Sequence, residues 1–374
     1  MAKKVYVGVN GVARKIKKGY IGDVYDVARK IKKAYIGIGG VARPCWSGGD
    51  LVYYGTITGI SYSGESGNAY VRSAASVGNY AIFAGRKKGT DYVDVYNKSL
   101  THSNLAALSG CPVCGTTLGG YAIFANYNIS VAYNTSLTQS NLSSLGGISV
   151  IQDPTATTVG SYALFAGGNP VPAYPNERAT KAYNSSLTLI TATTHRGSAG
   201  TSTTVGNYAL FAGGAVMYEN ASYVDAYNTS LTRSDVTALS KARNTKTATT
   251  VGSYALFLGG CSNPTSGTPI SVVDAYNYSL TRSVPSSLSV ARYVEGGNNA
   301  TTIGDFALIA GGETGTYVGY SATNVVDVYN SSLVRTTTTN LSVARRPMAV
   351  TLEDYAIFAG GTNTNTEVDV YTIR

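Results

Sequence analysis

The chain has 374 residues and a net charge of +9 at pH 7, yet only 13% of its residues are charged, about half the usual share. Eleven of the 29 Lys and Arg residues, but only two acidic residues, fall within positions 1–46, so the rest of the chain is neutral. No run of about 18 apolar residues is present, which excludes a membrane-spanning helix. The basic start also lacks the apolar core of a secretory signal.

Positions 1–47, called here the basic head, form a repeat with a period of about fifteen residues: YVGVNGVARKIKKG, YIGDVYDVARKIKKA and YIGIGGVARPCW. Asn10-Gly11 and Gly39-Gly40 separate short Val/Ile runs, and such dipeptides are typical of two-residue β-hairpin turns. We therefore predict a module of small hairpins, which needs a partner surface or self-association for stability.

Positions 48–374 contain seven near-copies of one unit, spaced 41 to 52 residues apart. Each unit has a Thr/Ala-rich stretch, a tight turn, an apolar phrase such as YALFAGG, a variable loop, a VDAYN-like phrase and a polar end. A short, continuously apolar run that ends in glycines is typical of a strand buried on both faces. Repetition of such units predicts an all-β, seven-bladed β-propeller with four-stranded blades. The apolar phrases begin at Tyr80, Tyr121, Tyr162, Tyr208, Tyr254, Phe306 and Tyr355.

The seventh unit stops at Arg374 and lacks a fourth strand. A spare strand, LVYYGTIT at 51–58, precedes the first unit. We expect it to complete the last blade, which would remove an exposed strand edge and join the two ends of the ring.

These repeats resemble the Kelch family, whose pattern runs from small residues and Arg, through a strand ending in Gly-Gly, to an acidic-x-Tyr phrase. Positions 341–374 carry the whole pattern, and the similarity extends over about 50–374. One difference is that Leu stands where the family usually has Trp in the fourth strand.

Five of the seven units have both an Asp before the x-Tyr phrase and an Arg ahead of the first strand, whereas units two and three lack both. We predict that the two side chains form a buried pair within each blade, because losing one partner leaves a costly unpaired charge. A ring of ligand-binding Arg side chains at the pore is the alternative. The predicted pairs are Arg72–Asp94, Arg196–Asp225, Arg243–Asp274, Arg292–Asp327 and Arg345–Asp369.

Reactive groups are sparse. The two histidines fall in different units, so we expect no catalytic residues, no cofactor and no metal site. Cys111 and Cys114 have the spacing of half a zinc site, but a closed site needs four ligands. Ordinary thiols, a local disulfide and a metal site remain open for this pair. The repeated Asn-x-Ser sequences fall in the YN-x-SL phrases and predict Asn-capped turns.

The basic head resembles, more loosely, N-terminal modules of tail and other virion-associated proteins from phages and prophages of Gram-positive, clostridia-like bacteria. That resemblance implies a non-enzymatic virion or tail protein, located in a virion or outside the cell. The head would bind other virion proteins, and the propeller loops would recognise a host surface glycan or protein. A homotrimer and a polyanion-binding head are further possibilities, nucleic acid being the less favoured polyanion. The alternative function is an extracellular carbohydrate-active enzyme or lectin. The anchor or polyanion residues are Arg14, Lys15, Lys17, Lys18, Arg29, Lys30, Lys32 and Lys33.

Overall fold

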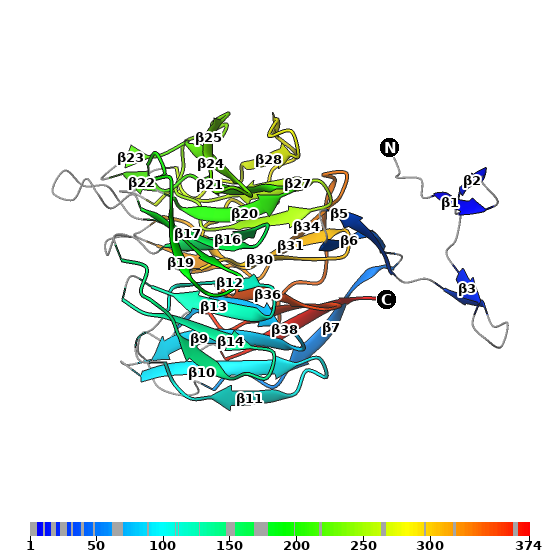
Figure 1. Cartoon of the computed structure of the whole chain (residues 1–374), viewed down its shortest axis with the longest axis horizontal. Helices are drawn as coiled ribbons and strands as arrows, with labels where there is room; N and C mark the ends of the chain where they lie inside the picture. Colours follow the sequence, from blue (N-terminus) through cyan, green and yellow to red (C-terminus); the bar gives the residue numbers. More distant parts are fainter. Residues whose placement is uncertain are drawn as a thin grey trace.

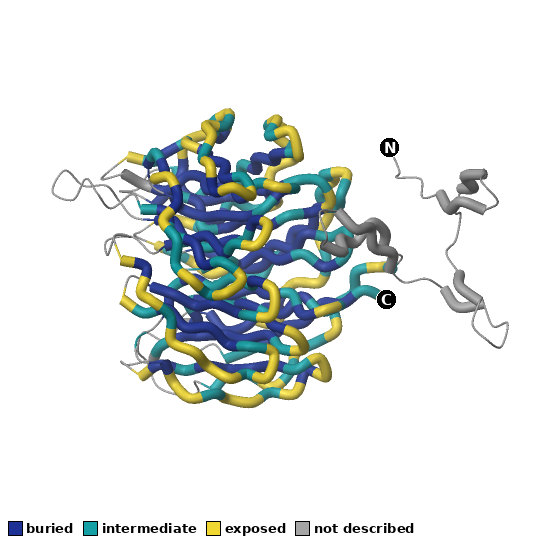
Figure 2. Tube along the Cα trace, in the orientation of Figure 1, coloured by how far each residue is buried: buried dark blue, intermediate teal, exposed yellow. Residues whose placement is uncertain are grey.

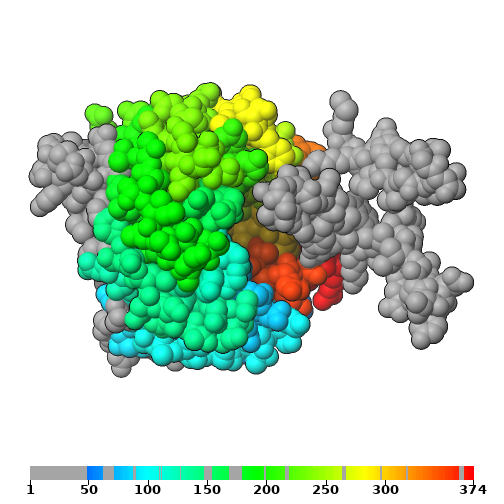
Figure 3. Space-filling model, in the orientation of Figure 1, coloured from blue at the N-terminus to red at the C-terminus, as the bar shows by residue number. Residues whose placement is uncertain are grey.

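The computed structural model describes residues 49–374 apart from positions 62–69, 88–89, 109, 111, 127, 147–153, 168–178, 198, 217–218, 263–266, 295–296, 317–318 and 362–365. Within positions 1–48 it describes only the backbone of six short strands. Seven four-stranded antiparallel sheets form a ring, which confirms the predicted all-β propeller (Figure 1). Successive blades are neighbours around the ring, so the chain colours follow one another around the surface in Figure 3.

The strands of each blade are given from the channel outwards. Blade 1 has β8 (Tyr70–Val77), β9 (Tyr80–Lys87), β10 (Thr90–Asn97) and β11 (His102–Leu105). Blade 2 has β12 (Cys114–Leu118), β13 (Tyr121–Ala125), β14 (Ser130–Asn134) and β15 (Gln139–Asn141). Blade 3 has β16 (Thr155–Val159), β17 (Tyr162–Ala166), β18 (Thr180–Asn184) and β19 (Leu189–Ala192). Blade 4 has β20 (Thr201–Val205), β21 (Tyr208–Ala212), β24 (Val224–Asn228) and β25 (Arg233–Val236).

Blade 5 has β26 (Ala248–Val251), β27 (Tyr254–Leu258), β28 (Val273–Asn277) and β29 (Arg282–Ser283). Blade 6 has β30 (Ala300–Ile303), β31 (Phe306–Ala310), β34 (Val326–Asn330) and β35 (Arg335–Thr337). Blade 7 has β36 (Met348–Leu352), β37 (Tyr355–Ala359), β38 (Val368–Ile373) and β7 (Leu51–Ile57). Five two-stranded hairpins lie outside the blades: β1 (Tyr6–Val9) with β2 (Val12–Lys15), β3 (Tyr20–Gly22) with β4 (Ala28–Lys30), β5 (Lys33–Ile38) with β6 (Val41–Ser47), β22 (Ala215–Val216) with β23 (Glu219–Asn220), and β32 (Glu313–Thr314) with β33 (Ser321–Ala322).

The ring closes as the sequence predicts. Strand β7 pairs antiparallel with β38, from Ile57 opposite Val368 to Leu51 opposite Ile373. Two backbone hydrogen bonds between Asp50 and Arg374, 2.8 and 3.0 Å long, continue the pairing. The spare strand therefore completes blade 7 and covers the edge that β38 would otherwise expose.

The core lies between neighbouring blades, where the apolar second and third strands face one another (Figure 2). In blade 5 the Phe257 and Tyr276 rings meet edge to face, 5.8 Å apart. The Tyr276 hydroxyl donates a 2.8 Å hydrogen bond to the carbonyl of Thr237 in the preceding blade. Tyrosine therefore suits this position better than phenylalanine, because its ring fills the core and its hydroxyl joins two blades.

The YN-x-SL phrases form tight turns, as predicted. The Asn277 side-chain oxygen accepts hydrogen bonds from the backbone N–H groups of Ser279 and Thr281, both 3.0 Å long. Leu280 then has φ near 58°, a left-handed conformation that is unfavourable for leucine. The Asn cap therefore stabilises a strained turn, which recurs at Leu100, Leu137, Leu187, Leu231, Leu280 and Leu333.

Threonines of the innermost strands form a belt around the central channel. The Thr158 hydroxyl donates to the Thr117 carbonyl of the preceding blade at 2.7 Å, and Thr351 donates to Thr302 at 2.8 Å. These hydroxyls bind backbone carbonyls on the free edge of each innermost strand, which has no neighbouring strand. The threonine belt consists of Thr117, Thr158, Thr204, Thr250, Thr302 and Thr351.

The ring has two different faces. Because the strands are antiparallel, each innermost strand begins beside the end of the second strand, as Thr201 does beside Ala212. The face where the innermost strands begin, called here the mouth face, therefore also carries the variable loops. The opposite face, called here the turn face, carries the short hairpin turns and the junction with the basic head at Gly49. In Figure 1 the turn face and the C-terminus lie on the right.

Candidate functional site

A cavity of about 110 Å³ lies on the mouth face, where the seven innermost strands converge. It is lined by residues from every blade, among them Ser73, Cys114, Thr155, Ser202 and Ala349. Beneath it the central channel has a volume of about 460 Å³ and is lined by Thr, Ser, Ala, Val and Asn residues. Enclosure by all seven blades makes this mouth cavity the strongest candidate for a binding site.

Two cationic side chains, Arg72 and Lys246, are among the described lining residues of the mouth cavity, and no carboxylate is among them. Both residues are partly exposed. Asp153 and Glu295 are near lining residues in the sequence but lie outside the described part of the chain. Arg72 and Lys246 also interact with other residues of the chain, and they are the two basic groups that the described lining offers to a ligand.

A β-bulge places Arg72 in the cavity. The pairing of β8 with β9 shifts register between Val71 and Ser73, so Arg72 is the extra residue. Bulges redirect a side chain from its expected direction along a strand. Arg72 thus lies within its innermost strand, whereas the paired Arg residues of blades 4 to 7 precede theirs.

The structure brings together four of the five predicted Arg–Asp pairs. Arg243 lies 2.7 Å from Asp274, and both side chains are fully buried. Burial lowers the pKa of the Arg243 guanidinium, while the charge of Asp274 and its hydrogen bond oppose that shift. The other distances are 2.7 Å for Arg196–Asp225, 2.9 Å for Arg292–Asp327 and 2.6 Å for Arg345–Asp369. These pairs lie within blades, so they do not form a ligand-binding ring at the pore.

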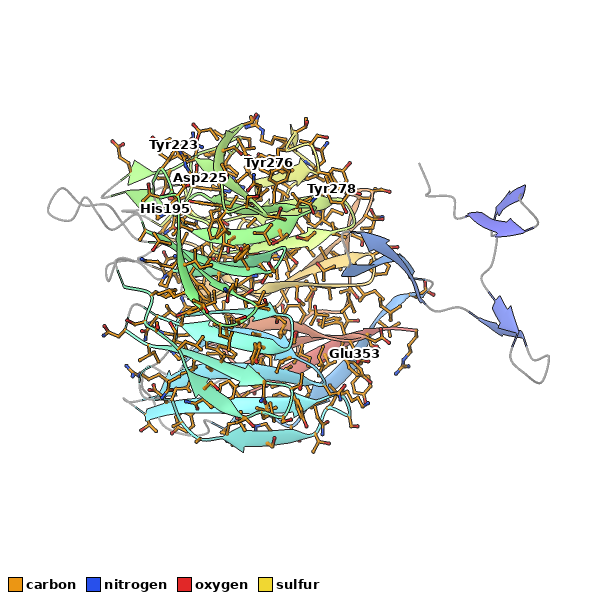
Figure 4. The ribbon with its side chains drawn as sticks, in the orientation of Figure 1. His195, Tyr223, Asp225, Tyr276, Tyr278 and Glu353 are labelled. Carbon is orange, nitrogen blue, oxygen red and sulfur yellow. The ribbon has the colours of Figure 1, made fainter. Side chains whose placement is uncertain are left out.

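In blade 4 the pair belongs to a larger cluster. The Arg196 guanidinium also lies 5.2 Å from the centre of the Tyr223 ring, which stands near Asp225 in Figure 4. Arg233 and Asp235 complete the cluster through ion pairs of 2.7 to 3.0 Å. The cluster joins the outer strands of blade 4 to the loop ahead of β20, so its charged residues stabilise the blade.

The prediction of an Arg72–Asp94 pair is wrong, because Arg72 is not among the described partners of Asp94. Asp94 instead contacts His102 Nε2 at 2.7 Å and accepts hydrogen bonds from the backbone N–H and hydroxyl of Ser61. The bulge turns Arg72 to the mouth cavity, and a histidine on the outer strand takes the place of the arginine.

Sequence reasoning missed these outer-strand partners, although a signal was present. In four of the five blades with the Asp, the residue eight positions later is basic and reaches it: His102, Arg233, Arg282 and Arg335. Tyr53 of β7 does the same for Asp369. Blades 2 and 3 have Gln139 and Leu189 at that position, so they lack this partner as well. In blade 3, Lys181 replaces the Asp and donates to Thr191 at 2.9 Å.

Neither histidine lines the mouth cavity. His102 lies on the outer strand of blade 1, and His195 is buried 3.4 Å from the Thr180 hydroxyl (Figure 4). No group of three or more metal-binding side chains is found within the described residues. Nor does the described part of the chain contain a helix long and apolar enough to cross a membrane.

Some predicted residues lie outside the described part of the chain. These are Cys111, which leaves the Cys111–Cys114 pair untested, and the side chains of Arg14, Lys15, Lys17, Lys18, Arg29, Lys30, Lys32 and Lys33.

The ring is similar to several solved propellers. Virginiamycin B lyase from Staphylococcus aureus superposes with a TM-score of 0.58 at 8% identity, covering 87% of this chain and 99% of the other. A catalytically inactive histidine-to-alanine variant of the same enzyme with quinupristin gives 0.59 at 9% identity, with 87% and 100% covered. The protein YjhT gives 0.51 at 12% identity, with 85% and 96% covered. No protein-family model and no curated protein matches the sequence.

These neighbours correct the predicted function. The expected non-enzymatic virion protein is contradicted, because propellers similar over most of this chain are lyases, which are enzymes. At 8–9% identity the likeness itself shows the fold alone. The sequence prediction relied on the absence of a familiar catalytic motif, and a propeller fold by itself does not specify one function.

Proposed function

We propose that the protein is a propeller enzyme that acts on a small, carboxylate-bearing molecule held in the mouth cavity. The observation that carries this proposal is the cavity itself, with Arg72 and Lys246 as the basic residues of its described lining. An arginine binds a carboxylate through parallel hydrogen bonds, and Lys246 lines the same cavity from another blade.

A lyase-type elimination is the reaction that these two side chains support. Arg72 would stabilise the negative charge that develops on the substrate carboxylate. Lys246 would act as the general base that removes the proton from the neighbouring carbon. The electron pair of that C–H bond would form a double bond as the leaving group departs from the next carbon. No histidine would be needed, in contrast to the solved enzyme that a histidine-to-alanine change inactivates.

The test combines binding and turnover with matched variants. We expect uronic acids and other acidic sugars to bind the wild-type chain, and Arg72→Ala to weaken binding at least about tenfold, since a charge-assisted hydrogen bond contributes about 1.5–3 kcal/mol. Lys246→Ala should retain binding better but abolish formation of the unsaturated product, followed by ultraviolet absorbance. Lys98→Ala, in an exposed turn on the opposite face, is the control. Equal affinities in Arg72→Ala and Lys98→Ala would refute the site.

The finer assignments of the repeat and of the cellular location are also proposals. Support for a Kelch-type repeat comes from the buried Arg–Asp pairs and from second strands that end in glycines with positive φ, such as Gly259 and Gly311. Support for an extracellular location comes from the low content of charged residues.

We further infer that the basic head attaches the propeller to a polyanion, such as a phosphate-rich wall polymer. Support comes from its eleven cationic residues and from its junction at Gly49 on the turn face, opposite the mouth cavity. Removal of residues 1–47 should abolish retention on a phosphate-rich column at low salt while leaving the propeller folded. Unchanged retention of the truncated chain would place the polyanion site elsewhere.

A further inference from the structure

We propose that the central channel binds a small anion at the level of the threonine belt, through a ring of backbone N–H groups. This site is separate from the mouth cavity and does not depend on the proposed enzyme activity. It follows from which backbone groups of the innermost strands face the channel and which of them already have partners.

The hairpin turns determine which residues face the channel. Val205 and Tyr208 flank a two-residue turn and therefore exchange both of their backbone hydrogen bonds. The alternate residue, Thr204, must direct its N–H and C=O away from β21, toward the channel. The Thr204 carbonyl accepts the Thr250 hydroxyl from the next blade, which agrees with this direction. The equivalent residues are Ser76, Thr117, Thr158, Thr204, Thr250, Thr302 and Thr351.

At the level of the threonine belt, threonine hydroxyls donate hydrogen bonds to the backbone carbonyls that face the channel. The Thr204 hydroxyl donates its proton to the Thr158 carbonyl, so the 2.8 Å contact between Thr157 and Thr204 requires Thr157 to be the donor. The Thr204 hydroxyl then both donates and accepts. The same arrangement recurs between Thr203 and Thr250 at 2.9 Å. Six of the seven channel-facing carbonyls accept a threonine hydroxyl, whereas the N–H groups beside them receive no protein acceptor among the described residues.

One level nearer the mouth, a side chain already satisfies part of the backbone. The Asn298 amide bonds both the N–H and the carbonyl of Ala248, at 3.3 and 2.8 Å. Its oxygen also accepts from the N–H of Ala300, and its backbone carbonyl accepts from Ala349. The N–H groups of Ala248, Ala300 and Ala349 therefore have acceptors, whereas those at the belt level have none among the described residues, and backbone N–H groups directed into one channel favour anions.

Carboxylates at one end of the channel favour one direction of entry. Asp305, Glu353 and Asp354 are in hairpin turns on the turn face, and their negative charges disfavour the approach of an anion from that side. An anion would therefore enter from the mouth. The channel has a volume of about 460 Å³. One water molecule occupies about 30 Å³ in the liquid, so a halide or a tetrahedral oxyanion fits together with its nearest waters.

The test uses the full chain with bromide, a halide that is visible by anomalous scattering. We expect crystals grown in sodium bromide to show an anomalous peak on the channel axis at the belt, and titration calorimetry to give saturable binding. Ser76→Asp places a carboxylate in the channel lining and should weaken bromide binding at least about tenfold. Ser136→Asp, in an exposed turn, should bind as the wild type does.

A second variant covers the case in which Ser76→Asp does not fold. Thr250→Val removes the hydroxyl that donates to the Thr204 carbonyl. The carbonyl oxygen then faces the channel without a donor, and its partial negative charge should also weaken bromide binding. An axial column of ordered waters without anomalous signal in the wild-type crystal would overturn the proposal. Bromide affinity equal in the wild type, Ser76→Asp and Thr250→Val would overturn it as well.

Discussion

Replacing Asp369 with Asn is expected to destabilise the closing blade by about 3–5 kcal/mol, the usual cost of leaving one charge of a buried pair without its partner. Asp369 and Arg345 are both fully buried, and their closest atoms are 2.6 Å apart. The substitution keeps the size of the side chain and removes its charge. The effect therefore measures the ion pair rather than a cavity.

The surroundings explain why the loss is not compensated. Arg345 also donates to the carbonyls of Gly360 and Phe358, at 2.8 and 3.0 Å, but these acceptors are neutral. An arginine does not lose its proton at neutral pH, so the positive charge would remain inside the blade. Conversely, Arg345→Met leaves a buried carboxylate that, among the described residues, accepts hydrogen bonds from the Ser342 N–H and hydroxyl and from the Tyr53 hydroxyl. We expect a similar cost of about 3–5 kcal/mol.

A double-mutant cycle provides the decisive measurement. The Arg345→Met/Asp369→Asn variant carries neither charge, so it should cost no more than the worse single variant, giving a coupling energy of about 3 kcal/mol or more. Urea unfolding followed by circular dichroism gives the free energies. Lys181→Met, at the equivalent position of blade 3, should change stability by less than about 0.5 kcal/mol, since its contact with Thr191 is exposed. Additive costs of the two single variants would refute the idea that they act as a pair.

Two further predictions concern the hydroxyl groups of the ring. Thr204→Val should lower the free energy of unfolding by about 1 kcal/mol, because it removes the hydrogen bond to the Thr158 carbonyl. Thr232 is exposed, so Thr232→Val should leave the stability unchanged. Equal effects of the two substitutions would argue against a stabilising threonine belt. Burial raises the pKa of Tyr133 to about 12 and that of Tyr276 further. The folded state thus holds these protons above pH 10, where the unfolded chain releases them, so this stabilisation is present below pH 10 and lost as pH rises toward 12 and above. Spectrophotometric titration should show the buried tyrosines ionising only as the chain unfolds; gradual ionisation of a folded ring would contradict it.

Much of the architecture could be predicted from the sequence because repetition sets it. Seven copies of an apolar run ending in glycines define the number of blades, and the spare strand at 51–58 defines the closure. Coincident loss of Arg and Asp in two units predicted pairs that the structure places in four blades, because a buried charge needs its partner in the same unit.

The residues of the mouth cavity were harder to predict from the repeat pattern. Arg72 is closer in sequence to its hairpin turn than the other arginines are to theirs, and it lies within β8, where a bulge between Val71 and Ser73 turns it to the mouth cavity. Lys246 has no counterpart in the repeat, so its position at the mouth cavity depends on where the seven innermost strands converge. The function predicted from the basic head was wrong, since a short resemblance at one end says little about the ring.

The sequence by itself thus determined the number, order and closure of the blades, because these follow from hydrophobic periodicity and from turn residues along the chain. Only the tertiary structure decided which side chains come together from different blades: Arg72 and Lys246 in the lining of one cavity, and the threonine hydroxyls with the carbonyls of the preceding blade. Such contacts join residues far apart in the sequence. They depend on strand register and on the angle between blades, which a local pattern does not contain.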